Sequence, residues 1–267
     1  MLAQVRDGVG VITLNRAERR NALHPEMLDA VPALVQRFST DPEVGCILLT
    51  AAGTAFCAGG DVRDGIDRRR QAGSRLADGA VPDVEAAARA LAHDARMVLA
   101  LHESPTISLA ALPGPAVGAG IGIALAADLR IAATSARLVP GWARLGFSGD
   151  FGGAWLLTRL IGPARTLELL VDGEGLDAAT ALGLGVFNRV VPGEELGEAA
   201  FEWARRIASG PRAAHASMKQ NVAEPSVLSL REALPLEADR MARSGQTEDH
   251  RAAVRAWLEA ATAKAEG

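Results

Sequence analysis

Asp150 is a carboxylate in apolar, glycine-rich surroundings, within the stretch LVPGWARLGFSGDFGGAW (138–155). Trp142 precedes it by eight residues, and Phe147 and Phe151 flank it. Apolar neighbours desolvate a carboxylate and raise its pKa, which suits an acid or base that works near neutral pH. A purely structural role is also open, because Asp is a common helix N-cap and the residues from 152 onward have a helical pattern.

Two glycine-rich loops form the second candidate feature. They are TAFCAGGDV (54–62) and the first part of GPAVGAGIGIALAADLRIAA (114–133), and each follows a short apolar run. The second loop leads into a predicted helix, so the amides near Ala119 and Gly120 lack acceptors within that helix and carry its partial positive charge. Two such amides could converge on one oxygen. The alternative is that the small residues only allow a helix to pack closely on a sheet.

The elements that must position these loops follow from hydrophobic periodicity and turn residues. An Asp-Gly pair between apolar runs predicts a hairpin over 3–14. Helices are predicted over 25–38 and 83–102. Short buried strands are expected over 45–51, 106–112 and 128–133. Strands that alternate with helices indicate an α/β fold with a largely parallel sheet.

From about residue 152 the pattern is mainly helical, with one strand expected over 188–191. We therefore predict a core domain over 1–195, and a helical C-terminal region over 196–267 that packs on a neighbouring subunit. The predicted helices cover 152–161, 163–171, 177–183, 194–209, 211–223, 227–242 and 248–264.

Composition excludes several classes of protein. The net charge of −4 gives no basic surface for nucleic acid. Two cysteines, Cys46 and Cys57, form neither a disulfide framework nor a zinc motif, which indicates a reducing compartment. The uncharged run 107–127 is long enough to span a bilayer, but Pro113-Gly114-Pro115 interrupts it. We expect a cytoplasmic protein that binds neither membrane nor nucleic acid.

Three familiar motifs are incomplete. GAGIG (118–122) lacks the third glycine of a dinucleotide fingerprint, because position 123 is Ile. GFSGD (146–150) has Asp150 in place of the last glycine of a nucleophile elbow. The five histidines form no metal-ligand cluster, so neither a metal nor a permanently bound cofactor is expected. The charged segment 63–82 is interpreted as a solvated surface segment.

Five segments together resemble the crotonase (enoyl-CoA hydratase/isomerase) superfamily, in order, over roughly residues 5–220. They are LNRAERRNAL, AFCAGGDV, GPAVGAGIGIALAADLRIAA, LGFSGDFGGAWLLTRLIG and ALGLGVFNRVV. The resemblance implies a spiral ββα core, a homotrimer or homohexamer, and coenzyme A thioesters as substrates. It also implies that the amides of Ala58 and Ala119 form an oxyanion hole for the thioester oxygen. The positions that it implies for coenzyme A binding are Arg19, Arg20, Ala22, Ala55 and Asp61.

The catalytic positions depart from the hydratase pattern. Hydratases of this superfamily use two glutamates, and the positions that match them, aligned on Asp128, are Gly122 and Trp142. Both acids are missing, which disfavours ordinary water addition. Isomerases of the superfamily that act on unsaturated or ring-derived acyl-CoAs place a proton-shuttling aspartate where Asp150 stands. This resemblance implies an isomerase in which Asp150 is the general acid and base.

Three other functions stay open. The resemblance also covers the 4-chlorobenzoyl-CoA dehalogenase, in which the matching aspartate is a nucleophile, and the spacings of Trp142 and His93 fit that enzyme. His93 would then activate the water that cleaves the aspartyl ester. The isomerase is favoured because proton shuttling needs fewer matched residues. An atypical hydratase and an acyl-CoA-binding protein without catalysis are the remaining alternatives.

Overall fold

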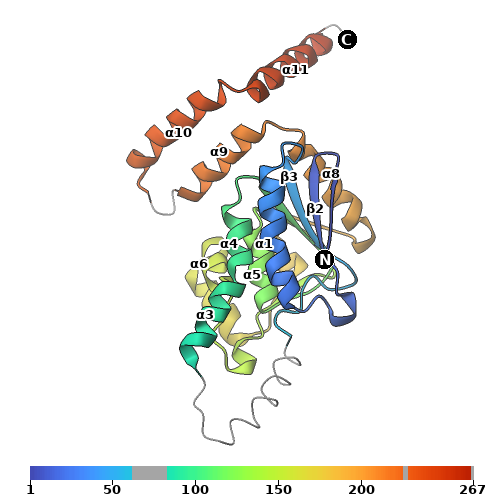
Figure 1. Ribbon diagram of the computed structural model, residues 1–267, viewed down its shortest axis with the longest axis vertical. Coiled ribbons are helices and arrows are strands. Elements are labelled where there is room, and N and C mark those ends of the chain that lie inside the picture. Colours follow the sequence, from blue (N-terminus) through green and yellow to red (C-terminus); the bar gives the residue numbers. More distant parts are fainter. Residues whose placement is uncertain (62–82, 225–227, 266–267) are drawn as a thin grey trace, which may run out of the picture.

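The structure is a computed structural model that describes residues 1–61, 83–224 and 228–265. The segment 63–82, interpreted above as solvated surface, lies outside the described residues. Figure 1 shows a body of strands and helices from which the last two helices project.

The predicted hairpin is confirmed. Strands β1 and β2 pair antiparallel, and Asp7 and Gly8 between them both have positive φ, as a tight two-residue turn requires. The main sheet has the order β1-β2-β3-β4-β6-β9, and every pair after the first is parallel. Its strands are β1 (Leu2–Arg6), β2 (Val9–Leu14), β3 (Cys46–Ala51), β4 (Ile107–Leu112), β6 (Leu129–Ala133) and β9 (Arg189–Val191).

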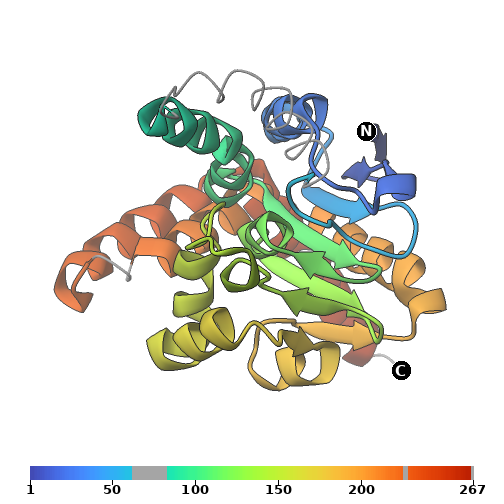
Figure 2. The same ribbon diagram turned by 90° about the horizontal axis from the view of Figure 1, so that it is seen from below.

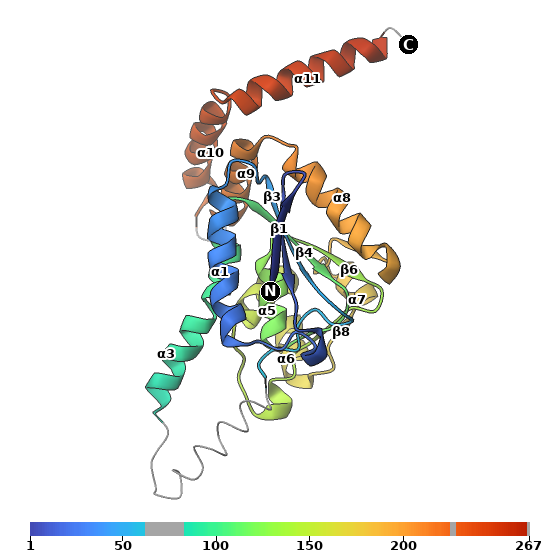
Figure 3. The same cartoon turned by 45° about the vertical axis from the view of Figure 1, so that its right-hand side comes forward.

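Helices cover both faces of the sheet at β2, β3, β4 and β6, which explains why these strands are short apolar runs without alternation, whereas β1 at the edge is exposed. On one face lie α1 (Pro25–Thr40), α4 (Arg96–Glu103) and α5 (Ala119–Ala126), and on the other lies α8 (Leu196–Ala208) (Figure 3). Helix α8 packs on the sheet through Leu196, Ala200 and Ala204, although the predicted C-terminal region begins at its first residue. Figure 2 shows the central strands with helices around them.

Some details differ from the sequence prediction. The helix expected over 83–102 is divided at Ala95 into α3 (Val84–Asp94) and α4. A small second sheet of β5 (Ala116–Val117), β7 (Arg137–Val139) and β8 (Leu176–Asp177) was not anticipated. Its strands are two or three residues long, too short to produce a periodic pattern.

The predicted helices after residue 152 are present. Helix α6 (Gly153–Asp172) contains the expected break, because Gly162 has non-helical φ 77° and ψ 165°. The others are α7 (Ala178–Gly183), α9 (Arg212–Ala223), α10 (Leu230–Ser244) and α11 (Glu248–Ala265). Helix α10 starts with a capping box of Ser229 and Glu232. In the described part of the chain, no helix combines the length and apolar character needed to cross a membrane.

Candidate active site

Asp150 lies in the loop between the 3₁₀ turn η2 (Ala143–Leu145) and helix α6. The indole Nε1–H of Trp142 donates a hydrogen bond to Asp150 Oδ1 at 2.9 Å, and Trp142 is buried. The loop turns sharply, with positive φ at Gly149, Phe151 and Gly152. The backbone of Phe151 is strained, because the left-handed region is unfavourable for a residue with a Cβ.

Asp150 is not the cap of the helix that follows. Gly152 occupies the N-cap position of α6, and no side chain makes a capping hydrogen bond there. The carbonyl of Asp150 accepts from the Gly153 amide at 3.1 Å, while its carboxylate is bonded to Trp142. The structural alternative considered from the sequence therefore does not describe this loop.

Burial raises the pKa of Asp150 above its ordinary value, and the hydrogen bond from Trp142 opposes that rise. The expected direction is confirmed. Phe151, the next residue in the sequence, is buried, whereas Phe147 is 53% exposed. An indole is a neutral donor, so Asp150 is partly buried without a compensating positive charge from this partner.

The two glycine-rich loops lie against each other, backbone to backbone. The amide of Val117 donates to the Cys57 carbonyl at 2.8 Å, and the amide of Phe56 donates to the Pro115 carbonyl at 3.0 Å. A Cβ at Gly59 would lie 2.6 Å from the Val117 oxygen and 3.4 Å from the Ala119 nitrogen. Only glycine fits there, so the spacing between the loops depends on it.

The start of helix α5 connects these loops to Asp150. Ala119 is the first residue of α5 and is buried. A Cβ on the preceding Gly118 would lie 3.8 Å from Trp142 Nε1, the atom that bonds Asp150. Gly153 also touches the indole, since a Cβ there would lie 2.7 Å from its Cη2. The carboxylate of Asp150 and the unpaired amide of Ala119 are therefore both close to the indole of Trp142.

The amide of Ala58 is already paired in this structure. It donates to the Arg20 carbonyl at 3.0 Å. Gly60, two residues later, is exposed, and a Cβ there would meet open space. Within the described residues, the Gly60 amide has no hydrogen-bond partner. The sequence did not predict which of these amides is unpaired, because nothing in the pattern AFCAGGD distinguishes its successive amides.

The residues expected to bind coenzyme A lie on two adjoining loops. Arg19 and Arg20 are exposed, whereas Ala22 and Ala55 are buried and can offer only backbone atoms. The carboxylate of Asp61 is largely buried and paired with Arg16 at 3.0 Å.

Two residues that the sequence analysis did not single out hold these loops together. Arg16 also donates to the Ala22 carbonyl at 3.2 Å. Buried Asn21 donates to the carbonyls of Ala52 and Ala55, both at 2.9 Å, and accepts from the Arg16 amide. A buried polar side chain with every bond satisfied is a strong positional constraint.

His93 is placed differently from Asp150 and Trp142. It lies on α3, exposed, with its Nδ1 3.6 Å from Asp94 and its carbonyl and ring in contact with the Arg96 guanidinium. Among the described residues, no hydrogen bond or ion pair joins His93 to Asp150 or Trp142. None of these contacts links the third residue of the proposed dehalogenase set to the first two.

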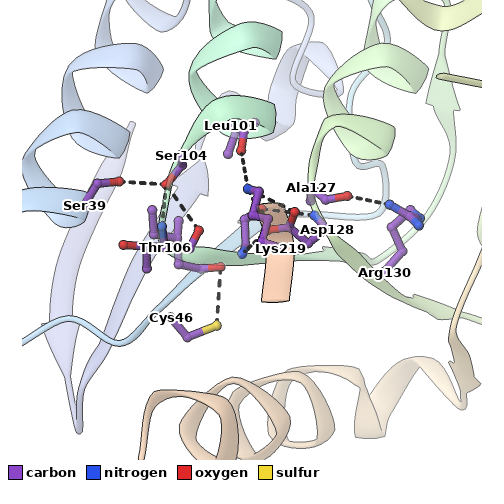
Figure 4. Close-up of polar contacts among 11 residues, drawn as sticks. Ser39, Cys46, Leu101, Ser104, Thr106, Ala127, Asp128, Arg130 and Lys219 are labelled. Carbon is purple, nitrogen blue, oxygen red and sulfur yellow. Dashed lines mark hydrogen bonds and ion pairs between the residues drawn. The ribbon is translucent and has the colours of Figure 1, made fainter. Parts of the chain in front are cut away.

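A second carboxylate, Asp128, sits in a separate polar cluster (Figure 4). Lys219 of α9 forms an ion pair with it at 3.0 Å and also reaches the Leu101 carbonyl. Ser108 donates to Asp128 through its amide at 2.8 Å and its hydroxyl at 2.9 Å. This cluster ties α9 to the start of β6. Across the described parts of the chain, no group of three potential ligands could hold a metal ion.

Comparisons with known proteins agree with this arrangement. The sequence profile of the family described as Enoyl-CoA hydratase/isomerase matches residues 4–267. The chain is 34% identical to the 1,2-epoxyphenylacetyl-CoA isomerase of Escherichia coli (strain K12), over 97% of this chain and 95% of that protein. It is 31% identical to a 4-chlorobenzoyl coenzyme A dehalogenase of Arthrobacter sp, over 82% and 76%.

The fold comparison gives the same family. The crystal structure of an enoyl-CoA hydratase from Polaromonas sp. JS666 superposes with a TM-score of 0.86 at 29% identity, and covers 97% of this chain and 96% of that one. The crotonase-like α/β fold with a helical C-terminal region is thus confirmed. The chain belongs to the enoyl-CoA hydratase/isomerase family of acyl-CoA enzymes.

Proposed function

We propose that this protein isomerises an acyl-CoA thioester, with Asp150 moving the proton. The observation that supports this most directly is the single neutral hydrogen bond from Trp142 to a partly buried carboxylate. A carboxylate with a raised pKa both accepts and returns a proton near neutral pH. Isomerisation needs one such group, because the proton leaves one carbon and returns to another.

Backbone amides supply the charge stabilisation in this proposal. Proton removal next to a thioester builds negative charge on the carbonyl oxygen, and fixed N–H donors stabilise it. We assign the donors to Ala119 and Gly60, which have no other acceptor among the described residues. Ala58 would first have to release the Arg20 carbonyl, at a cost of about 1 kcal/mol.

The packing of Gly122 is a further reason to favour isomerisation over hydration. A Cβ at this position would lie 2.0 Å from the Phe151 carbonyl oxygen. A glutamate cannot stand there unless the loop that carries Asp150 moves. The loop conformation and an acidic side chain at position 122 therefore exclude each other sterically.

Dehalogenation receives less support, because His93 pairs with Asp94 and Arg96 rather than with Asp150. The two reactions leave different isotopic traces. A panel of unsaturated, ring-epoxide and chlorobenzoyl CoA thioesters would first identify a substrate by mass spectrometry. A single turnover in H₂¹⁸O would follow. Isomerisation predicts no label in the peptide that contains Asp150, whereas ¹⁸O in that carboxylate would contradict the proposal.

We also infer that the chain assembles into a homotrimer or homohexamer. Helices α10 and α11 project from the body (Figure 1) and expose large apolar side chains. Leu230 and Met241 are 75% exposed, and Trp257 is 70% exposed. Apolar residues this exposed indicate an interface. Light scattering should give three or six chains, and a monomer at micromolar concentration would refute the inference.

A further inference from the structure

A pocket with two unpaired arginines lies at the opposite end of the sheet from Asp150. Its floor contains the first residues of three adjacent strands, Ile107 of β4, Leu129 of β6 and Arg189 of β9. The candidate active-site loops follow the other end of β4, and a six-residue strand is about 20 Å long. This pocket, named the Arg189 pocket, therefore does not belong to the site described above. Its lining comprises Ile107, Leu129, Arg189, Trp203, Arg206, Ile207, Gly210 and His215.

Two positively charged side chains line this pocket. Arg189 comes from β9 and Arg206 from α8, and no ion pair engages either guanidinium within the described residues. Glu202 interacts electrostatically with Arg206, but its carboxylate is paired with Arg205 at 2.8 Å. Both arginines are exposed, and some desolvation together with the neighbouring charge of Arg206 lowers the pKa of Arg189. Two like charges that face one pocket repel each other, and a bound anion would relieve this.

The guanidinium of Arg189 is held in one orientation by an aromatic ring. It stacks on the Trp203 ring at 3.7 Å from the ring centre. Stacking occupies the flat face of a guanidinium and leaves its in-plane N–H groups available for a carboxylate or phosphate. The contact with Trp203 therefore orients the N–H donors of Arg189 before a ligand binds.

His215, which lines this pocket and a neighbouring one, supplies an independent observation. Its Nδ1 is buried and has no hydrogen-bond partner, the only such side-chain atom among the described residues. Gly210 makes room for the ring, since a Cβ there would lie 2.4 Å from His215 Cε1. A buried polar atom without a partner is rare in native proteins and often marks a missing ligand or water.

We propose that the Arg189 pocket binds a small organic anion, a carboxylate or phosphate with a compact apolar body. Arg189 and Arg206 would bind the charged group, and Trp203, Ile107 and Ile207 would contact the body. The cavity volume of about 470 Å³ exceeds what a bare phosphate fills, which favours an organic ligand. This site is separate from the proposed reaction at Asp150 and does not depend on it.

Titration calorimetry with benzoate, phenyl phosphate and neutral benzamide tests the proposal. Benzoate or phenyl phosphate should bind the wild-type protein, and Arg189→Gln or Arg206→Gln should weaken that binding at least tenfold. Arg165→Gln is the matched control, because Arg165 is an exposed arginine on α6 that does not line the pocket. Its affinity for the probes should equal that of wild type.

Three results would overturn the proposal. They are no binding of either anion at millimolar concentration, equal affinity for benzamide and benzoate, and affinity unchanged in both pocket variants. A fourth result also counts against it. If the wild-type protein is an oligomer that binds no probe, and the Gln substitutions make it dissociate, the pocket lies in a subunit interface and the proposal fails. The turnover of an acyl-CoA substrate by these variants should match wild type, so failure here is distinguishable from failure of the Asp150 mechanism.

Discussion

Two aspartates lie near opposite ends of helix α5 and have contrasting surroundings. Asp128, just after the end of α5, receives two hydrogen bonds from Ser108 and an ion pair from Lys219. Asp150, near the start of α5, receives one hydrogen bond from a neutral indole. The first carboxylate has its charge compensated, whereas the second is partly buried with little compensation. Full compensation favours a structural role, and its absence leaves a group poised to exchange a proton.

The largest effect is expected at Asp150. Asp150→Asn removes the acid and base while keeping the shape, and should reduce kcat/KM by about 10³-fold, within the usual contribution of a positioned general base. Steady-state kinetics on the substrate identified in the panel would measure it. The matched control is Asp172→Asn, an exposed carboxylate at the end of α6, which should leave the rate unchanged.

The same substitution has a predicted effect on stability. Because burial raises the folded-state pKa of Asp150 above its unfolded value, ionised Asp150 destabilises the folded chain. This destabilisation is absent below the unfolded pKa and develops as pH rises through the folded pKa. Asp150→Asn should therefore be at least as stable as wild type at pH 7, with less advantage at pH 4, in thermal unfolding. A large loss of stability at pH 7 would mean that the carboxylate is structural.

At Asp128 a substitution should reduce stability strongly and the reaction rate little, the reverse of what is expected at Asp150. Asp128→Asn leaves Lys219 without its counter-charge and should lower the free energy of unfolding by about 1–3 kcal/mol. The rate per folded enzyme should stay within a few-fold of wild type. Denaturant unfolding of the single variants and of Asp128→Asn with Lys219→Met checks this, because the double loss should be less than the sum. Additive losses would show that the two residues do not interact.

A single methyl group at Gly122 should disturb the Asp150 loop. The added Cβ of Gly122→Ala would collide with the Phe151 carbonyl, so the loop must shift, at a cost of about 1–3 kcal/mol. Turnover should fall as Asp150 moves. Gly183→Ala is the control, since Gly183 lies in α7 with open space around it. If both variants behave alike in unfolding and turnover, the close contact at Gly122 is not important.

The smallest effect is expected at Trp142. Trp142→Phe keeps the ring but removes the donor, and the hydrogen bond from that donor lowers the pKa of Asp150. The pKa should rise further, so the pH at which kcat/KM increases should move upward, with about a tenfold loss at neutral pH. A pH profile identical to that of wild type would contradict this assignment.

Sequence patterns predicted most of the fold because its strands and helices are long enough to show their periods. The hairpin turn at Asp7-Gly8, the break at Gly162 and the parallel sheet all follow from local signals. The direction of the pKa shift at Asp150 also followed from its apolar neighbours. These features depend on residues close together in the chain.

Features that depend on distant segments were not predictable in the same way. The Ala58 amide is paired because the Arg20 carbonyl comes from another loop, and Phe151 meets Gly122 across a gap of 29 positions. The exposure of Phe147 likewise arises from tertiary packing. So does the absence, among the described residues, of a bond between His93 and Asp150. Local pattern identifies which residues can do chemistry, and packing decides which of them meet.

Isotope exchange in deuterated water tests the proton-transfer role of Asp150 most directly. During turnover of the substrate identified in the panel, the product from wild-type enzyme should acquire solvent deuterium at a carbon near the thioester. Product formed by Asp150→Asn should appear far more slowly, whereas Asp172→Asn should match wild type. Equal rates and equal deuterium content in the wild-type and Asp150→Asn reactions would show that another group moves the proton.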